Sequence, residues 1–144
     1  MWQFWNHGAR YYLTGGSDTH DVFYSPYTGY PRVYAYIPSD NPTPEDFAWA
    51  EKEGRTFATY GPLVFTDPLP GSTIAVDSPD LTIEISLKLF AVDGLSKIEV
   101  TSLGQKIYEE TFNDKPMNTT LTLKFTASNV TTPPRIWMDP DNSL

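Results

Sequence analysis

The sequence contains no cysteine, and histidine occurs only twice in its 144 residues. Without thiols, neither a disulfide framework nor a thiolate metal site can form, and the redox compartment stays undetermined. Residues 63–144 carry no histidine at all. The acidic residues of that half lie on expected polar strand faces or in turns, and they form no catalytic constellation. We therefore expect residues 63–144 to serve structure or recognition.

Positive charge and long hydrophobic runs are also scarce. Ten Lys and Arg stand against 18 Asp and Glu, for a formal net charge of −8. This balance excludes a nucleic-acid partner, because phosphate backbones are bound by clustered cations. A small phosphorylated substrate stays open, since bound cations would reverse the local sign. No apolar run approaches the ~20 residues of a membrane span, and the first residues lack a signal-peptide pattern, so no membrane partner is expected.

Aromatic residues, prolines and glycines are plentiful instead. Aromatics make up 15% of the chain, beside 13 prolines and 9 glycines, and the hydrophobic content of 40% is enough to bury a core. Frequent turn residues favour many short strands over a helical bundle. The length suits one domain, or one domain with a fragment of another. Three bulky aromatics among the first five residues indicate a cut inside a larger protein, because chain ends are usually polar.

One loop near the start combines two metal-ligand residue types. Residues 10–14 (RYYLT) stop at Gly15 and Gly16, which predicts a buried strand that ends in a tight turn. Just beyond, Asp18 and His20 stand two positions apart, and a carboxylate beside an imidazole suits zinc, manganese or iron. Alternatively, Asp18 bonds its own backbone in an Asx-turn and His20 is an ordinary surface residue. The local pattern leaves both interpretations open.

Helical and strand signals flank a tyrosine-rich stretch. A helix is expected over residues 2–7, and residues 32–37 (RVYAYI) have β character inside the stretch 22–42. That stretch predicts a binding loop, or else tyrosines that merely cover a sheet face. Thr43 and Pro44 predict the cap and first residue of a second helix, and Gly54 predicts its left-handed end. A strand is expected at residues 55–59.

From residue 63 onward the pattern is one of alternation. Residues 81–89 (LTIEISLKL) place apolar side chains on one face, which predicts a half-buried antiparallel strand. Further strands are expected near residues 98–100, 106–110, 121–125 and 135–138, with turn signals between them. Strands at this spacing predict a β-sandwich, so the fold class is α+β and mainly β. Sequons at Asn118 and Asn129 matter only in a eukaryotic secretory setting.

Four segments carry a resemblance to a known family. They are residues 5–10 (WNHGAR), 15–20 (GGSDTH), 29–34 (GYPRVY) and 54–62 (GRTFATYGP). In content, order and spacing this set resembles the C-terminal part of bacterial PHP-domain metallohydrolases, the polymerase and histidinol phosphatase superfamily, in its carbaryl-hydrolase-like subgroup. The resemblance implies a terminal βα fragment of a PHP-type barrel over residues 1–62. It also implies an appended Ig-like antiparallel β-sandwich over residues 63–144.

The resemblance further implies a metal site and a substrate class. In the family, a distorted (β/α) barrel holds a metal cluster, and its final Asp-x-His motif supplies ligands. Carried over, Asp18 and His20 are ligands of a divalent metal, namely Zn, Mn or Fe. The implied substrate is a small phosphoester or related ester, hydrolysed with a nucleophile that the metal makes available near neutral pH. Arg32 is a candidate for pairing with an anionic group of that substrate, or else an ordinary surface arginine.

The remaining family ligands, a His-x-His pair, a Glu and further histidines, have no counterparts here. A catalytic zinc site typically needs three protein ligands and a water. We therefore expect a C-terminal fragment of a metal-dependent hydrolase, inactive alone and located, with its parent, in the bacterial cytoplasm or outside the cell. The alternatives are a non-catalytic module that binds carbohydrate or a protein partner, and a structural spacer. An unpaired strand at residues 10–14 would invite a homodimer.

Overall fold

The computed structural model of the chain describes residues 11–21, 23 and 29–130, apart from the side chain of residue 129. This part is mainly β, with antiparallel sheets and short helices, as the sequence predicts. None of its helices is long and apolar enough to cross a membrane. The elements are β1 (Arg32–Ala35), α2 (Pro44–Lys52), β2 (Thr56–Thr59), β3 (Leu63–Asp67), β4 (Thr82–Phe90), β5 (Lys97–Ser102), β6 (Gln105–Thr111), β7 (Asn118–Thr126) and α3 (Ala127–Val130).

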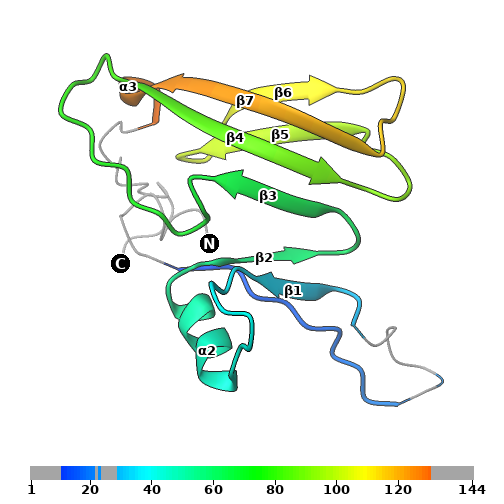
Figure 1. Cartoon of the computed structure of the whole chain (residues 1–144). Coiled ribbons are helices and arrows are strands. Elements are labelled where there is room, and N and C mark those ends of the chain that lie inside the picture. The colour runs from blue at the N-terminus through cyan, green and yellow to red at the C-terminus, as the bar shows by residue number, and fades with distance from the viewer. Residues whose placement is uncertain (1–10, 22, 24–28, 131–144) are drawn as a thin grey trace, which may run out of the picture.

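The strands form three antiparallel sheets. β1 pairs with β2, β5 pairs with β6, and a three-stranded sheet has the order β3-β4-β7. The three-stranded sheet and the β5-β6 hairpin lie face to face in the upper half of Figure 1, while β1, β2 and α2 lie below β3. The first sheet thus comes from the part of the chain before residue 62, and the other two come from the part after it.

The hydrophobic core lies between the β3-β4-β7 sheet and the β5-β6 hairpin. Alternate residues of the two long strands, such as Leu87 and Leu89 of β4 and Leu123 and Phe125 of β7, point into it and are buried. Side chains from the hairpin, Ile98 among them, cover this cluster from the other side. The alternation that predicts these strands is therefore the pattern of one buried and one solvated face.

Helix α2 begins and ends where the sequence predicts. Thr43 caps it through a capping box with Asp46, and Pro44 is its first residue. Gly54, just past its end, has a φ of +69°, a conformation that glycine adopts without a steric penalty. Within the helix only Ala50 is buried, so tertiary packing supports little of it.

Within the described residues, one expected strand is absent, and one observed strand was not expected. Residues 11–14 belong to no strand, although their apolar character predicts one; they run past α2, where the ring of Tyr12 packs onto Gly54 and Thr14 donates a hydrogen bond to Glu51. Apolar side chains alone do not make a strand, because a neighbouring backbone must accept the pairing. Conversely, β3 (Leu63–Asp67) was not predicted. The helix expected at residues 2–7 and the strand expected at residues 135–138 lie outside the described residues.

Candidate functional site

The loop that carries Asp18 and His20 lies on the surface. Asp18 has a φ of +52°, a left-handed conformation that aspartate tolerates better than most residues. The hydroxyl of Thr19 donates to Oγ of Ser17 over 2.9 Å, and the backbone N–H of Phe23 donates to Oδ1 of Asp21 over 2.8 Å. Local hydrogen bonds of this kind shape the loop, and the bond from Phe23 to Asp21 has the pattern of an Asx-turn.

The structure brings the two predicted ligands together. Nδ1 of His20 lies 2.6 Å from the backbone carbonyl oxygen of Asp18 and donates to it in the tautomer that protonates Nδ1. Nε2 of the same ring lies 3.6 Å from Oδ1 of Asp18. The two side chains are 73% and 88% exposed, for His20 and Asp18 respectively. They form a solvent-facing pair rather than the wall of a closed cavity.

This geometry fits two neighbouring ligands of one metal ion. Ligand bonds of about 2.1 Å at a tetrahedral angle place two donor atoms about 3.4 Å apart, close to the observed separation of Nε2 and Oδ1. A hydrogen bond from the other ring nitrogen to a backbone carbonyl is the support that metal-binding histidines commonly have. Among the described residues, however, no three His, Cys, Asp or Glu side chains gather as a metal site. By themselves, the two described side chains would make only part of a coordination shell.

Arg32 does not join this pair in the described part of the chain. It is exposed at the start of β1, where it lies opposite Thr59 of β2. It forms no ion pair with any described residue. Within the described part of the chain, no ion pair connects Arg32 to Asp18 and His20.

Among the described residues, α2 borders hollows on two sides. One, of about 380 Å³, lies between residues 11–14 and the helix, where Glu51 and Lys52 contribute its charged groups. The other, of about 320 Å³, is largely apolar. Its lining residues are Tyr36, Ile37, Pro38, Trp49, Arg55 and Leu69.

Arg55, at the edge of the apolar hollow, has a structural role that sequence reasoning missed. Its Nη1 donates to the carbonyl oxygen of Pro70 over 2.8 Å and to Oγ of Ser72 over 2.6 Å. It thereby holds the loop after β3 against the start of β2. Such charge-assisted bonds are stronger than neutral ones. Nη1 of Arg55 therefore serves to fix the loop after β3.

The aromatic residues form a ladder across two sheets. The ring of Tyr34 stacks on Phe57 at 5.4 Å between centroids, and Tyr36 and Phe65 meet edge to face at 6.2 Å. Phe65 in turn meets Phe90 edge to face at 6.0 Å, with the ring planes at 87°. The rings of Tyr34 and Phe57 are nearly parallel, whereas those of Tyr36, Phe65 and Phe90 are turned edge to face in succession. The ladder packs the β1-β2 ribbon onto the three-stranded sheet.

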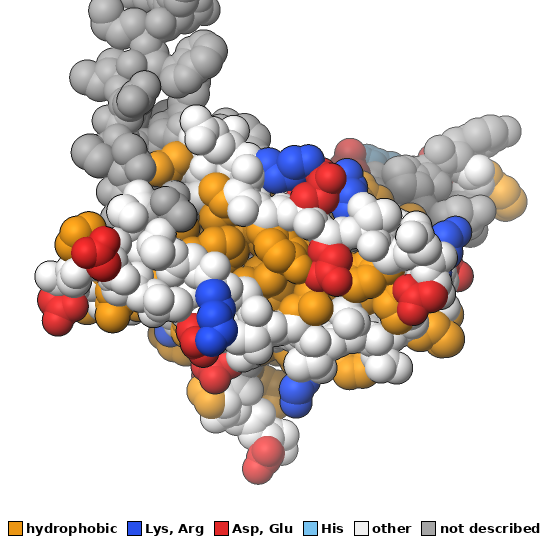
Figure 2. All heavy atoms as spheres, turned by 90° about the horizontal axis from the view of Figure 1, so that it is seen from above, with side chains coloured by type: hydrophobic (Ala, Val, Ile, Leu, Met, Phe, Trp, Pro, Cys, Tyr) orange, Lys and Arg blue, Asp and Glu red, His pale blue; other side chains and the backbone are white. Residues whose placement is uncertain are grey.

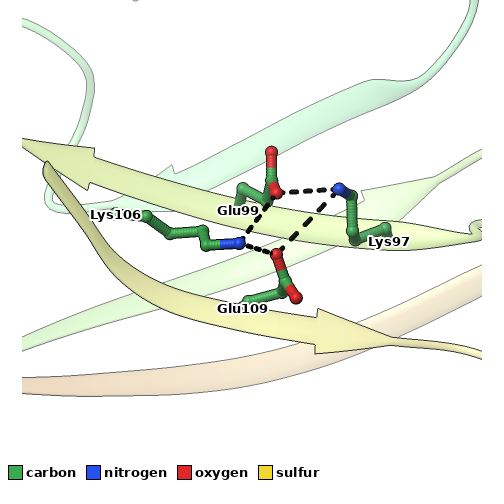
Figure 3. A network of polar contacts seen from close by, with 4 residues as sticks. All are labelled: Lys97, Glu99, Lys106 and Glu109. Carbon is green, nitrogen blue, oxygen red and sulfur yellow. Dashed lines mark hydrogen bonds and ion pairs between the residues drawn. The ribbon is translucent and has the colours of Figure 1, made fainter. Parts of the chain in front are cut away.

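A charged cluster lies on the β5-β6 hairpin and involves four residues that sequence reasoning did not single out. Glu99 and Glu109 face each other across the hairpin, and Lys97 and Lys106 lie between their carboxylates (Figure 3). The Lys97 hydrogen bond, of 2.7 Å, is the main cause that lowers the pKa of Glu99 to about 2. The bond to Glu109 raises the pKa of Lys106. The lysines thus neutralise two opposed carboxylates, a stabilising arrangement rather than a catalytic one.

Comparisons of the chain with protein-family models, with curated proteins and with solved structures gave no match. Any functional assignment therefore depends on the residues and contacts described above. Among them, Asp18 and His20 are the two sequence-predicted ligands, and the structure places Nε2 and Oδ1 3.6 Å apart.

Proposed function

We propose that this chain supplies Asp18 and His20 to the metal centre of a PHP-type hydrolase that acts on a small phosphoester or related ester. In this proposal residues 1–62 are the C-terminal part of the barrel, and residues 63–144 are an appended Ig-like sandwich. The remaining ligands are assigned to polypeptide other than these 144 residues, as in the family that the sequence resembles. The chain alone is then inactive.

The Asp18–His20 geometry carries this proposal. Its support is the 3.6 Å separation of Oδ1 and Nε2 together with the hydrogen bond that orients the imidazole. The carboxylate contributes negative charge toward a cation, and the exposure of the pair leaves room for further ligands to approach. A divalent metal bound there would supply a nucleophile near neutral pH and stabilise developing negative charge.

The alternative, a non-catalytic module for carbohydrate or a protein partner, has weaker support. Its strongest feature is the row of half-exposed rings that includes Tyr34, Phe65 and Phe90. Flat sugar faces stack best on rings that share one plane, whereas Phe65 and Phe90 meet edge to face. Contacts between the rings therefore explain this aromatic row without a ligand.

Zinc titration followed by NMR tests the metal role directly. The chain has two histidines, so the imidazole signals of His20 are assigned by comparison with a His7→Gln variant. We expect Zn²⁺ to shift the His20 signals with weak affinity, because two ligands make an incomplete site. The shift should be abolished in Asp18→Ala and kept in Asp40→Asn, an exposed carboxylate on another loop. A zinc response at His20 that survives Asp18→Ala would contradict the proposal.

A hydrolysis assay tests the expected inactivity. The purified chain should not hydrolyse a bis-aryl phosphodiester in the presence of Zn²⁺ or Mn²⁺. Rapid turnover that is lost in His20→Gln would show a complete active centre, and would contradict the assignment of the missing ligands to other polypeptide. Turnover unchanged by His20→Gln would point to a contaminant, which repeat purification through a second affinity tag would remove.

A further inference from the structure

The three-stranded sheet β3-β4-β7 has two edge strands, β3 and β7, and their outward backbone groups have different surroundings. At the β3 edge, the hydroxyl of Tyr36 donates to the backbone carbonyl of Val64, so an aromatic side chain occupies that edge. At the β7 edge, no strand of the described residues pairs with the nine residues Asn118–Thr126. Unpaired edges are templates for pairing with another chain unless a protein blunts them.

The hydrogen bonds at both ends of β7 show which backbone groups face outward. Ala91 donates to the carbonyl of Met117 over 2.8 Å, and Ala127 donates to the carbonyl of Leu81 over 2.8 Å. In an antiparallel pair these directions alternate, so the odd-numbered residues of β7 bond to β4. The N–H and C=O groups of its even-numbered residues therefore point away from the sheet. These residues are Asn118, Thr120, Thr122, Lys124 and Thr126.

The β7 edge carries few of the features that prevent pairing. The strand has no proline, and its register with β4 runs through nine residue pairs without a bulge. Its only charge, on Lys124, is paired with Glu84 of β4 over 2.6 Å. A long, regular and nearly uncharged edge is suited to β-augmentation.

We propose that β7 pairs antiparallel with β7 of a second copy, about a two-fold axis at Thr122. In this register Thr120 lies opposite Lys124 of the second copy, and Asn118 lies opposite Thr126. Even-numbered residues then meet even-numbered residues, so every outward N–H and C=O of the strand finds a partner. Lys124, the one charged residue of β7, faces Thr120, so no two like-charged β7 side chains face each other. The interface is isologous, as two-fold symmetry requires.

The same register matches the apolar side chains. Leu121 and Leu123 both point toward the core, and Leu121 is only half-buried. Viewed from above, on the side of β6 and β7, hydrophobic side chains form a patch between polar rows, with acidic side chains among them (Figure 2). Pairing would place Leu121 beside Leu123 of the second copy and would extend the apolar layer across the axis. Cross-strand apolar pairs of this kind stabilise sheets.

This interface differs from the homodimer expected through residues 10–14, and it does not depend on the proposed function. Because each copy carries a formal charge of −8, long-range repulsion opposes association. Added salt screens such repulsion, so the dimer should tighten as ionic strength rises. A dimer held by surface ion pairs would weaken under the same change.

Sedimentation equilibrium of the full chain over a range of concentrations tests the proposal. We expect a monomer–dimer equilibrium for the unmodified chain. Thr122→Lys places two ammonium groups opposite each other at the axis and should raise the dimer dissociation constant about tenfold or more. Ser86→Lys is the matched control. Ser86 lies opposite Thr122 on the central strand β4 and is exposed, so the substitution adds the same charge to the same sheet face but away from the edge. It should leave association nearly unchanged.

A second variant and a second readout keep the test decisive if one variant folds poorly. Thr122→Pro removes an outward N–H without removing a bond to β4, and edge strands tolerate proline at such positions. In the unmodified chain, the amides of Thr120, Thr122 and Lys124 should gain hydrogen-exchange protection as concentration rises. A monomer at all concentrations overturns the proposal. So does a dimer that Thr122→Lys and Thr122→Pro leave intact, which would place the interface elsewhere.

Discussion

The hydroxyl of Tyr36 donates to the backbone carbonyl of Val64 and ties the β1-β2 ribbon to the free edge of β3. A backbone hydrogen bond with Thr66, two residues along the same strand, involves the same hydroxyl. These are the groups that an additional strand would use, because Val64 and Thr66 alternate with the residues that bond to β4. One side chain thus joins the two halves of the described chain and blunts a sheet edge.

Tyr36→Phe should destabilise the protein by about 0.5–1.5 kcal/mol, since it removes a hydrogen bond and leaves the edge carbonyl without its donor. Urea unfolding followed by fluorescence measures this change. Tyr34→Phe is the matched control, because Tyr34 stacks on Phe57 through its ring alone. Equal losses in the two variants would show that the Tyr36 hydroxyl contributes nothing specific.

The same hydroxyl predicts a loss of stability at high pH. Burial raises the pKa of Tyr36 above 10.0, and the backbone hydrogen bond with Thr66 partly offsets this rise. In the unfolded chain the phenol therefore ionises first, so its stabilising effect is complete below about pH 10 and disappears as the pH rises through the folded-state pKa. Chemical unfolding between pH 8 and 12 (roughly two units either side of the ordinary pKa) measures the decline. The decline should be shallower in Tyr36→Phe.

Gly54→Ala should destabilise the protein by at least about 1–2 kcal/mol. The φ of +69° strains any residue with a Cβ, and that Cβ would lie 2.3 Å from the ring of Tyr12. Differential scanning calorimetry measures the loss. Gly16→Ala provides the control, because a Cβ there meets nothing within 4 Å and should cost little. A neutral Gly54→Ala would mean that Tyr12 does not pack on the end of α2.

Thr43→Ala should cost about 1 kcal/mol, a typical loss for an N-cap residue. The Thr43 hydroxyl accepts a hydrogen bond from the Asp46 backbone, and the Asp46 carboxylate accepts from the Thr43 backbone over 2.8 Å. Because Ala50 is the one fully buried residue of the helix, capping should carry a large share of its stability. Circular dichroism of the variant should show reduced helicity. Thr43→Ser retains a hydroxyl and should behave like the original chain.

Glu99 predicts a change of stability in acid. Its pKa of about 2, lowered chiefly by Lys97, lies below the ordinary value of 4.5. A lowered folded-state pKa means that the stabilising effect is present above pH 4.5 and is lost as the pH falls toward 2. Thermal unfolding measured across this window should show the decline. Glu99→Gln should flatten it, whereas Glu84→Gln, which leaves the hairpin cluster intact, should retain it.

Local signals predicted helix α2 and the long strands β4 and β7. A capping residue, a proline at the first position and a glycine at the end act within one turn, so Thr43, Pro44 and Gly54 were readable without tertiary information. β3 (Leu63–Asp67) escaped prediction because five residues between two prolines are too short for a clear period. The apolar run at residues 10–14 predicts a strand, yet residues 11–14 form none. An apolar run becomes a strand only where a neighbouring backbone pairs with it.

For the candidate site, the sequence determined that Asp18 and His20 are near each other, because residues two apart cannot separate far. It also determined the scarcity of further ligands, which follows from composition. The direction of the two side chains was decided by the left-handed turn at Asp18 and the hydrogen bond to its carbonyl. The opposed carboxylates of the hairpin, the Tyr36 contact at the β3 edge, and the place of β7 at the edge of its sheet among the described strands were decided only by tertiary structure. Strand register and sheet order join residues that are distant in the chain, and no local pattern encodes such pairings.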